Sequence, residues 1–182
     1  MKVNLPVSLL GPVIVVALAG MSSDAGAVTQ ERVFATNPAG ICQSALPVFD
    51  GVIRKRPKAV ANEGTSNSFI TCAFPSQGPD GVTDSPDNAI ALVVYLSSQS
   101  GSPQNITCTA VPGWDSYTFI PAVTKTVEAG PSSAFSAISW LPEDFGEGRT
   151  TLPTSLIAIS CNLPPSSAIN DSYLYFNEDV GT

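Results

Sequence analysis

Apolar and polar residues alternate with a period of two along three short stretches of the chain, at residues 68–74, 106–111 and 155–161. Such alternation is typical of β-strands that bury one face. Residues 89–96 are apolar at every position, which predicts a strand that is either buried on both faces or central in its sheet. Loops rich in Gly, Pro, Ser and Asp separate these stretches. The pattern therefore predicts a series of short strands.

Further short apolar runs recur at the spacing of about 8 to 12 residues that is expected of sandwiches and barrels. About 8–10 strands result, which is enough for two packed sheets. We predict an all-β fold, an antiparallel β-sandwich of jelly-roll-like or Ig-like type with two disulfides. Residues 62–65 are interpreted as the turn of a hairpin that joins strands at 58–61 and 68–74. The remaining strand candidates are 32–35, 48–54, 117–120, 122–127, 134–141 and 169–177.

Four cysteines, Cys42, Cys72, Cys108 and Cys161, are spread widely along the chain. The last three lie on the apolar sides of the alternating stretches, so their sulfur atoms should point into the core. An even number at wide spacing predicts two disulfides in an oxidising compartment. Of the three connectivities we prefer Cys42–Cys72 with Cys108–Cys161, because it joins sequence neighbours and pairs two well-patterned strands.

Residues 1–27 have the layout of a secretory signal peptide. Lys2 is the only cation before a long apolar stretch, and Ala25 and Ala27 form an A-x-A cleavage site. The alternative is an uncleaved membrane anchor, since about 18 apolar residues reach the lower limit for spanning a bilayer. Cleavage would leave residues 28–182 as a single all-β domain, secreted or periplasmic, without a membrane span.

The charge and composition of the chain argue against several classes of partner and of catalysis. Loss of Lys2 and Asp24 from eight cations and fifteen anions leaves seven and fourteen, so the net charge stays at −7. This balance disfavours nucleic acid and anionic membrane surfaces as partners. The chain contains no histidine, which excludes Ser-His-Asp and Cys-His catalysis. We expect no cofactor.

Carboxylates form three clusters, which leaves a small carboxylate-dependent hydrolase as the enzyme alternative, since such enzymes need two facing carboxyl groups. We expect solvated loop acids instead. The first cluster, Asp80, Asp84 and Asp87, is also a calcium candidate, although it lacks the EF-hand spacing. The other two clusters are Glu143, Asp144 and Glu147, and Asp171, Glu178 and Asp179.

Two features are candidate ligand contacts. Trp114 lies in a turn-rich segment where an exposed aromatic ring could stack on a sugar, whereas Trp140 is expected in the core. The basic run Arg54, Lys55, Arg56 and Lys58 could receive an anionic polysaccharide, a lipid head group or an acidic partner. The alternative for this run is an exposed, solvated turn.

Several segments together carry a family resemblance: an early Cys42, the strand FITCAFP at 69–75, VVYL at 93–96 before ITC at 106–108, and IAISCNLP at 157–164. The chain resembles a loose group of uncharacterised exported bacterial proteins with a four-cysteine all-β domain. The resemblance implies the fold and the disulfides but no activity. We therefore expect a non-catalytic structural or binding module of the cell envelope or exterior, with a carbohydrate-binding or adhesive domain as the narrower alternative and a glycan or protein as partner.

Overall fold

The computed structural model describes residues 29–74, 89–113, 121–131, 134, 136–153 and 157–179. Within this part the chain forms eleven strands and three short helices. The strands are β1 (Thr29–Thr36), β2 (Cys42–Ser44), β3 (Ile53–Arg56), β4 (Ala59–Asn62), β5 (Ser68–Ala73), β6 (Ala89–Ser98), β7 (Gln104–Pro112), β8 (Val123–Ala129), β9 (Ser136–Trp140), β10 (Ile157–Leu163) and β11 (Ser167–Asp179); the helices are α1 (Pro38–Ile41), η1 (Pro47–Phe49) and η2 (Pro142–Phe145).

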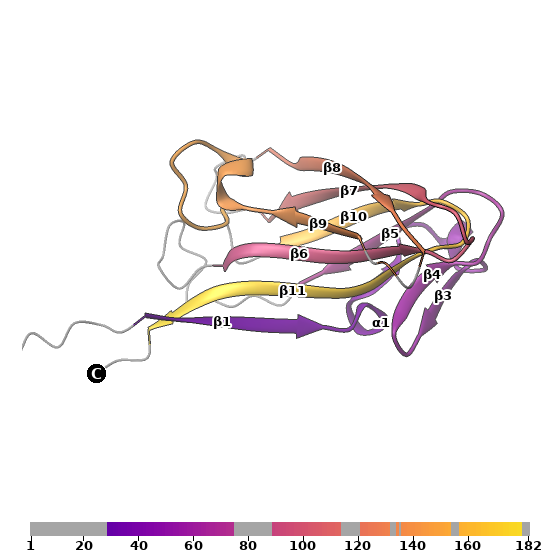
Figure 1. Ribbon diagram of the computed structural model, residues 1–182, viewed down its shortest axis with the longest axis horizontal. Coiled ribbons are helices and arrows are strands. Elements are labelled where there is room, and N and C mark those ends of the chain that lie inside the picture. Colours follow the sequence, from indigo (N-terminus) through magenta and orange to yellow (C-terminus); the bar gives the residue numbers. More distant parts are fainter. Residues whose placement is uncertain are drawn as a thin grey trace, which may run out of the picture.

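Two antiparallel sheets pack face to face (Figure 1). The larger sheet has the order β3-β4-β11-β6-β9, and β1 extends it by pairing with β11. The smaller sheet has the order β2-β5-β10-β7-β8. This arrangement confirms the predicted all-β antiparallel sandwich with two disulfides, with eleven described strands where about 8–10 were expected. The strand expected at 117–120 lies outside the described residues.

The apolar strand β6 occupies an interior position, between β11 and β9. Leu92, Val94 and Leu96 have no exposed surface, whereas the alternate residues Val93 and Tyr95 are half-buried. Side chains of a strand alternate between the two faces of a sheet, so the first set faces the core and the second faces outward. Of the two expectations for this strand, the central position is the correct one.

The core lies between the sheets and includes all four cysteines. One disulfide joins Cys42 on β2 to Cys72 on β5, and the other joins Cys108 on β7 to Cys161 on β10. These are the pairs that the sequence analysis preferred. In each bond the two residues are direct cross-strand partners, so both disulfides connect neighbouring strands of the smaller sheet.

Trp140 at the end of β9 is fully buried, as expected from the sequence. Its indole Nε1 donates a hydrogen bond of 3.0 Å to the carbonyl oxygen of Val123 on β8. A buried tryptophan normally satisfies its single donor in this way. Because β9 and β8 belong to different sheets, the bond ties their adjacent edges together.

The segment that follows β4 crosses between the sheets, which corrects the hairpin expected at residues 62–65. β4 pairs with β3 and β11, whereas β5 pairs with β2 and β10. The buried Asn62 amide fixes the crossing: Nδ2 donates to the carbonyl oxygens of Ser66 and Leu163, both at 2.8 Å, and Oδ1 accepts from the Gly64 amide at 2.9 Å. Since Leu163 ends β10, this side chain links the larger sheet to the smaller one.

Candidate ligand-binding site

The outer face of the larger sheet carries a group of tyrosines. On β11, Tyr173 and Tyr175 lie on either side of Leu174, which is 3% exposed and belongs to the core. Alternation therefore directs both tyrosines outward, where they are half-buried. On β6, Tyr95 is outward for the same reason. Sequence reasoning missed these residues, although the Tyr-Leu-Tyr alternation is a readable signal.

Strand register gathers these side chains into one surface. Tyr173 pairs with Val93 of β6 and Ala35 of β1. The rings of Tyr95 and Tyr173 meet edge to face, with centroids 5.7 Å apart and planes at 84°, a favoured aromatic geometry. Residues directly opposite each other in a sheet share a face. We define the tyrosine face as Val33, Ala35, Ala91, Val93, Tyr95, Tyr173 and Tyr175.

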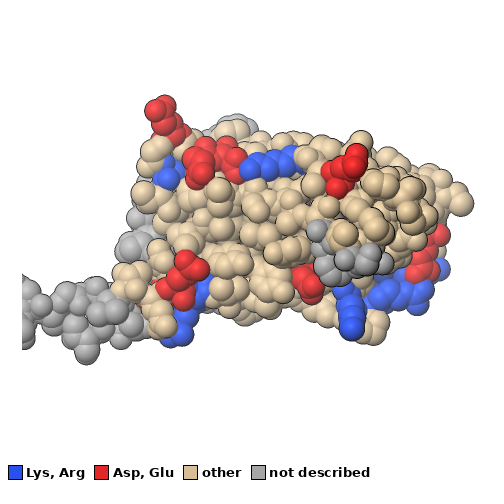
Figure 2. Space-filling view, viewed as in Figure 1, with Lys and Arg blue, Asp and Glu red and all other residues tan. Residues whose placement is uncertain are grey.

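Figure 2 shows the same side of the molecule as Figure 1, on which the larger sheet lies in front. A broad band of uncharged side chains crosses this side, with Lys, Arg, Asp and Glu residues around it and one acidic group below its middle. A contiguous, weakly polar surface bordered by charge is typical of interaction sites. The tyrosine face is therefore the first half of the candidate site.

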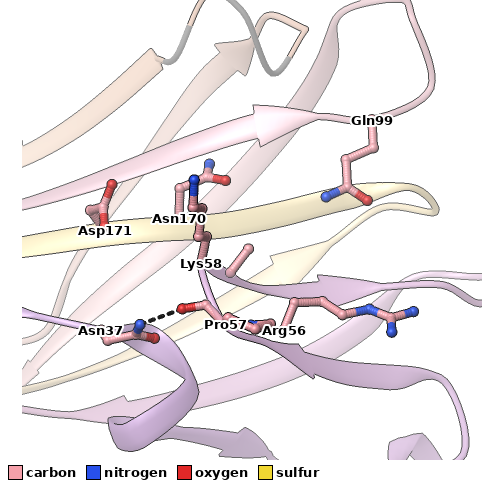
Figure 3. A pocket seen from close by; sticks show the side chains of 8 residues that line it. Asn37, Arg56, Pro57, Lys58, Gln99, Asn170 and Asp171 are labelled. Atoms are coloured by element: carbon pink, nitrogen blue, oxygen red, sulfur yellow. Dashed lines mark hydrogen bonds between the residues drawn. The ribbon is translucent and has the colours of Figure 1, made fainter.

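The second half is a pocket of about 620 Å³ with several polar side chains in its lining, which we call the amide pocket. It forms where the turn between β3 and β4 approaches β11 and the end of β6 (Figure 3). Register shifts between Ile169 and Asp171, so Asn170 is an extra residue with no partner on β6. Such irregularities often re-aim side chains beside functional sites. The lining residues are Asn37, Arg56, Pro57, Lys58, Ala59, Gln99, Asn170 and Asp171.

Two side-chain amides of the pocket are held firmly. Asn170 is 8% exposed, and its Nδ2 donates to the Ser97 hydroxyl at 2.9 Å. Asn37 caps α1 by accepting from the Ala39 amide at 2.9 Å, and it donates to the carbonyl oxygen of Pro57 at 2.6 Å. Groups fixed by such bonds bind a ligand with less loss of freedom. The pocket walls are therefore partly preorganised.

The remaining polar side chains of the pocket are exposed. In Figure 3, Gln99 and Lys58 extend towards β11 from opposite sides, while the guanidinium of Arg56 points away. Arg56 forms an ion pair with Glu63. Lys58 makes no ion pair with any residue that the structure describes, so its charge is available to a ligand. Asp171 supplies the one carboxylate among the eight lining residues.

The basic run expected from the sequence is only partly in this site. Arg56 and Lys58 line the amide pocket, whereas Arg54 and Lys55 do not. Arg54 instead donates to the carbonyl oxygen of Asp50 at 3.4 Å. Trp114 and the calcium candidates Asp80, Asp84 and Asp87 lie outside the described residues, so both expectations stay predictions.

The other two carboxylate clusters lie at η2 and along β11. Asp144 is bonded to Lys125 and accepts from the Leu141 amide at 2.8 Å. Asp171 and Glu178 are seven residues apart on one strand, which corresponds to roughly 23 Å, and Glu178 binds Arg32 at 2.7 Å. Glycosidase carboxylates are about 5 to 10 Å apart. Asp171 and Glu178 are therefore too far apart along β11 to act as such a pair.

The described residues contain no group of three or more His, Cys, Asp or Glu residues that could hold a metal ion. None of their helices has the length and apolar character needed to cross a membrane.

No protein-family model matches the chain, and no curated protein does. Several solved structures are similar to it, and three of them are described below. The carbohydrate-binding module TmCBM61 in complex with β-1,4-galactotriose has 10% identity and a TM-score of 0.36, over 82% of this chain and 88% of that one. The family 11 carbohydrate-binding module from Clostridium thermocellum, in complex with a β-1,3-1,4-mixed-linked tetrasaccharide, has 11% identity and a TM-score of 0.37, over 82% and 86%.

The third is the K2 cleaved adhesin domain of Lys-gingipain, with 13% identity and a TM-score of 0.33, over 78% of this chain and 88% of that one. At TM-scores this low, none of the three bears on function. The sandwich architecture rests on the strand pairing described above, and the site on its own geometry.

Proposed function

We propose that this protein is an exported, non-catalytic module that binds a polysaccharide along the tyrosine face and seats one sugar residue in the amide pocket. The observation that carries the proposal is the register that joins the two halves: Asp171 lines the pocket and pairs with Tyr95 of the face. From Asp171 to Tyr175, four residues of strand span roughly 13 Å. This is the scale of a short oligosaccharide.

The side-chain chemistry supports a sugar as ligand. A tyrosine ring offers a flat apolar surface with a polar tip, which suits the apolar C–H face and hydroxyl edge of a pyranose. Side-chain amides both donate and accept hydrogen bonds, and a carboxylate accepts several. Asn170, Gln99 and Asp171 therefore match a ring of hydroxyl groups, since ligand sites combine apolar walls with a few oriented polar groups.

Export is supported by the sequence and by the disulfides together. Residues 1–27 have the composition of a signal peptide, and the two disulfides favour an oxidising compartment. A secreted or periplasmic protein would meet polysaccharides of the envelope or surroundings directly. The acidic surface would keep it soluble there.

The test is glycan binding by the oxidised protein and by Tyr173→Ala. We expect the wild type to bind a subset of polysaccharides on a glycan array, and Tyr173→Ala to lower the affinity for these at least tenfold in isothermal titration calorimetry. Loss of a stacking ring removes contact area from the centre of the face. Tyr175→Ala is the second variant, in case Tyr173→Ala does not fold.

Phe69→Ala is the matched control, because Phe69 is an exposed aromatic residue on the outer face of the smaller sheet, 44% exposed. We expect it to leave the affinity unchanged. A wild type that binds no glycan, or equal losses from Tyr173→Ala and Phe69→Ala, would refute the proposal. Release of a product that depends on Asp171 would instead show a hydrolase.

A further inference from the structure

Among the described residues, some cationic side chains of this acidic protein form ion pairs and others do not. Arg32 binds Glu178, Arg56 binds Glu63 and Lys125 binds Asp144. Lys58 lines the amide pocket and has no acidic partner among the described residues. In a protein of net charge −7, a cation left available at the wall of a concavity is a local exception to a field that repels anions.

The backbone that carries Lys58 is held in place on both sides. The preceding residue, Pro57, has a fixed φ angle, and its carbonyl oxygen accepts the hydrogen bond from Asn37. The following residue, Ala59, begins β4 and is 7% exposed. The lysine side chain is flexible, but the point from which it extends is not. The base of the Lys58 side chain therefore stays at the wall of the pocket.

The pocket also separates opposite charges. Asp171 extends from β11, whereas Lys58 extends from the turn between β3 and β4 (Figure 3). A neutral sugar would offer the ammonium group only hydroxyl oxygens as acceptors and no charge to neutralise it. A sugar with one carboxylate could direct that group to Lys58 and its hydroxyls to Asp171. A carboxylate would add the attraction of opposite charges to the hydrogen bond that the ammonium group donates.

We infer that the amide pocket selects an acidic sugar residue, a hexuronic acid, and that Lys58 recognises its carboxylate. This inference rests on the proposed function, because it names the ligand class of the same site. Lys58 acts here as a specificity-determining residue, while the tyrosine face supplies affinity for the neighbouring sugars whatever their charge.

The experiment compares hexuronic acid oligosaccharides with their carboxyl-reduced, neutral counterparts. For the wild type we expect tighter binding of the acidic member of a pair, by about five- to tenfold at low ionic strength, the scale of one charge-assisted contact. Lys58→Gln should remove this difference by lowering the affinity for the acidic member about five- to tenfold, to that of the neutral member. Added salt should weaken only the acidic member.

Lys55→Gln is the matched control, because it removes the same charge from the neighbouring strand β3 but does not line the pocket. We expect less than a twofold change for either ligand. Equal losses from Lys55→Gln and Lys58→Gln would refute the inference, since they would indicate a general electrostatic effect. Equal binding of both ligands, still abolished by Tyr173→Ala, would refute the inference and leave the proposed function standing. Absence of all glycan binding would refute both.

Discussion

Asn62 illustrates how much one buried polar side chain contributes to this fold. It has no exposed surface, and all three of its side-chain hydrogen bonds go to backbone groups, one of them on the opposite sheet. Buried polar groups are stable only when they are bonded. Removing the amide would take one hydrogen-bond partner from the carbonyl oxygens of Ser66 and Leu163 and from the N–H of Gly64.

We expect Asn62→Ala to lower the free energy of unfolding by about 2–4 kcal/mol, since each buried group left without a partner costs about 1–3 kcal/mol. Chemical denaturation followed by fluorescence measures this change. Asn105→Ala serves as control, because Asn105 is exposed on β7, and should change stability by less than about 0.5 kcal/mol. A loss of under about 1 kcal/mol in Asn62→Ala would contradict the linking role.

Asn62 also marks the limit of prediction at the residue scale. In the sequence it precedes Glu63 and Gly64, a pattern that favours a turn, and a turn between two apolar runs suggests a hairpin. The decisive partner, Leu163, is 101 residues further along the chain. The residues around Asn62 carry no information about that long-range contact. The crossing of the chain from one sheet to the other therefore could not be predicted from the sequence.

At the scale of elements, the disulfide pairs and the buried faces of the strands could both be predicted from the same local pattern. Cys72, Cys108 and Cys161 occupy inward positions within alternating strands, and alternation is a local property. The two strands joined by each bond are direct neighbours in the smaller sheet. The larger sheet contains neither disulfide, so burial against the smaller sheet and strand pairing hold it in place.

We expect the two disulfides to contribute unequally to stability. In the chain-entropy model, closing the 53-residue separation of Cys108–Cys161 stabilises by about 4.1 kcal/mol and closing the 30-residue separation of Cys42–Cys72 by about 3.6 kcal/mol. Urea denaturation of two double variants, one with each disulfide replaced by a pair of alanines, measures which bond contributes more to the free energy of unfolding. A larger loss from the Cys42 and Cys72 pair would show that native packing, and not loop length, sets the contribution.

At the scale of the whole molecule, the class of fold follows from the sequence but the candidate site does not. The amide pocket combines four segments, represented by Asn37, Lys58, Gln99 and Asn170. The basic run made Lys58 a candidate ligand contact. No local sequence pattern predicts that the amide side chains of Asn37, Gln99 and Asn170 lie near it. The tyrosine face is easier to predict than the amide pocket. The alternation around Leu174 predicts two of its rings, Tyr173 and Tyr175, whereas Tyr95 joins them only through the register between β11 and β6.

Export gives a prediction for the entire chain. We expect the protein isolated from a secreting host to begin at Val28, because cleavage after Ala27 fits the A-x-A rule and leaves β1, which starts at Thr29, whole. N-terminal sequencing and intact mass measure this directly. Retention of residues 1–27 in a membrane fraction would instead support the uncleaved anchor.

The pairing of β1 with β11 has a mechanical consequence. Thr29 pairs with Asp179, so the first and last described strands start and finish at the same end of the sandwich (Figure 1). Ladder hydrogen bonds run perpendicular to antiparallel strands, and a force that pulls these two ends apart therefore breaks them one after another. The disulfides cross-link the other sheet and do not bear this load. Under tension the domain should unzip along β1 at low force, whereas attachment by one end alone would leave it intact.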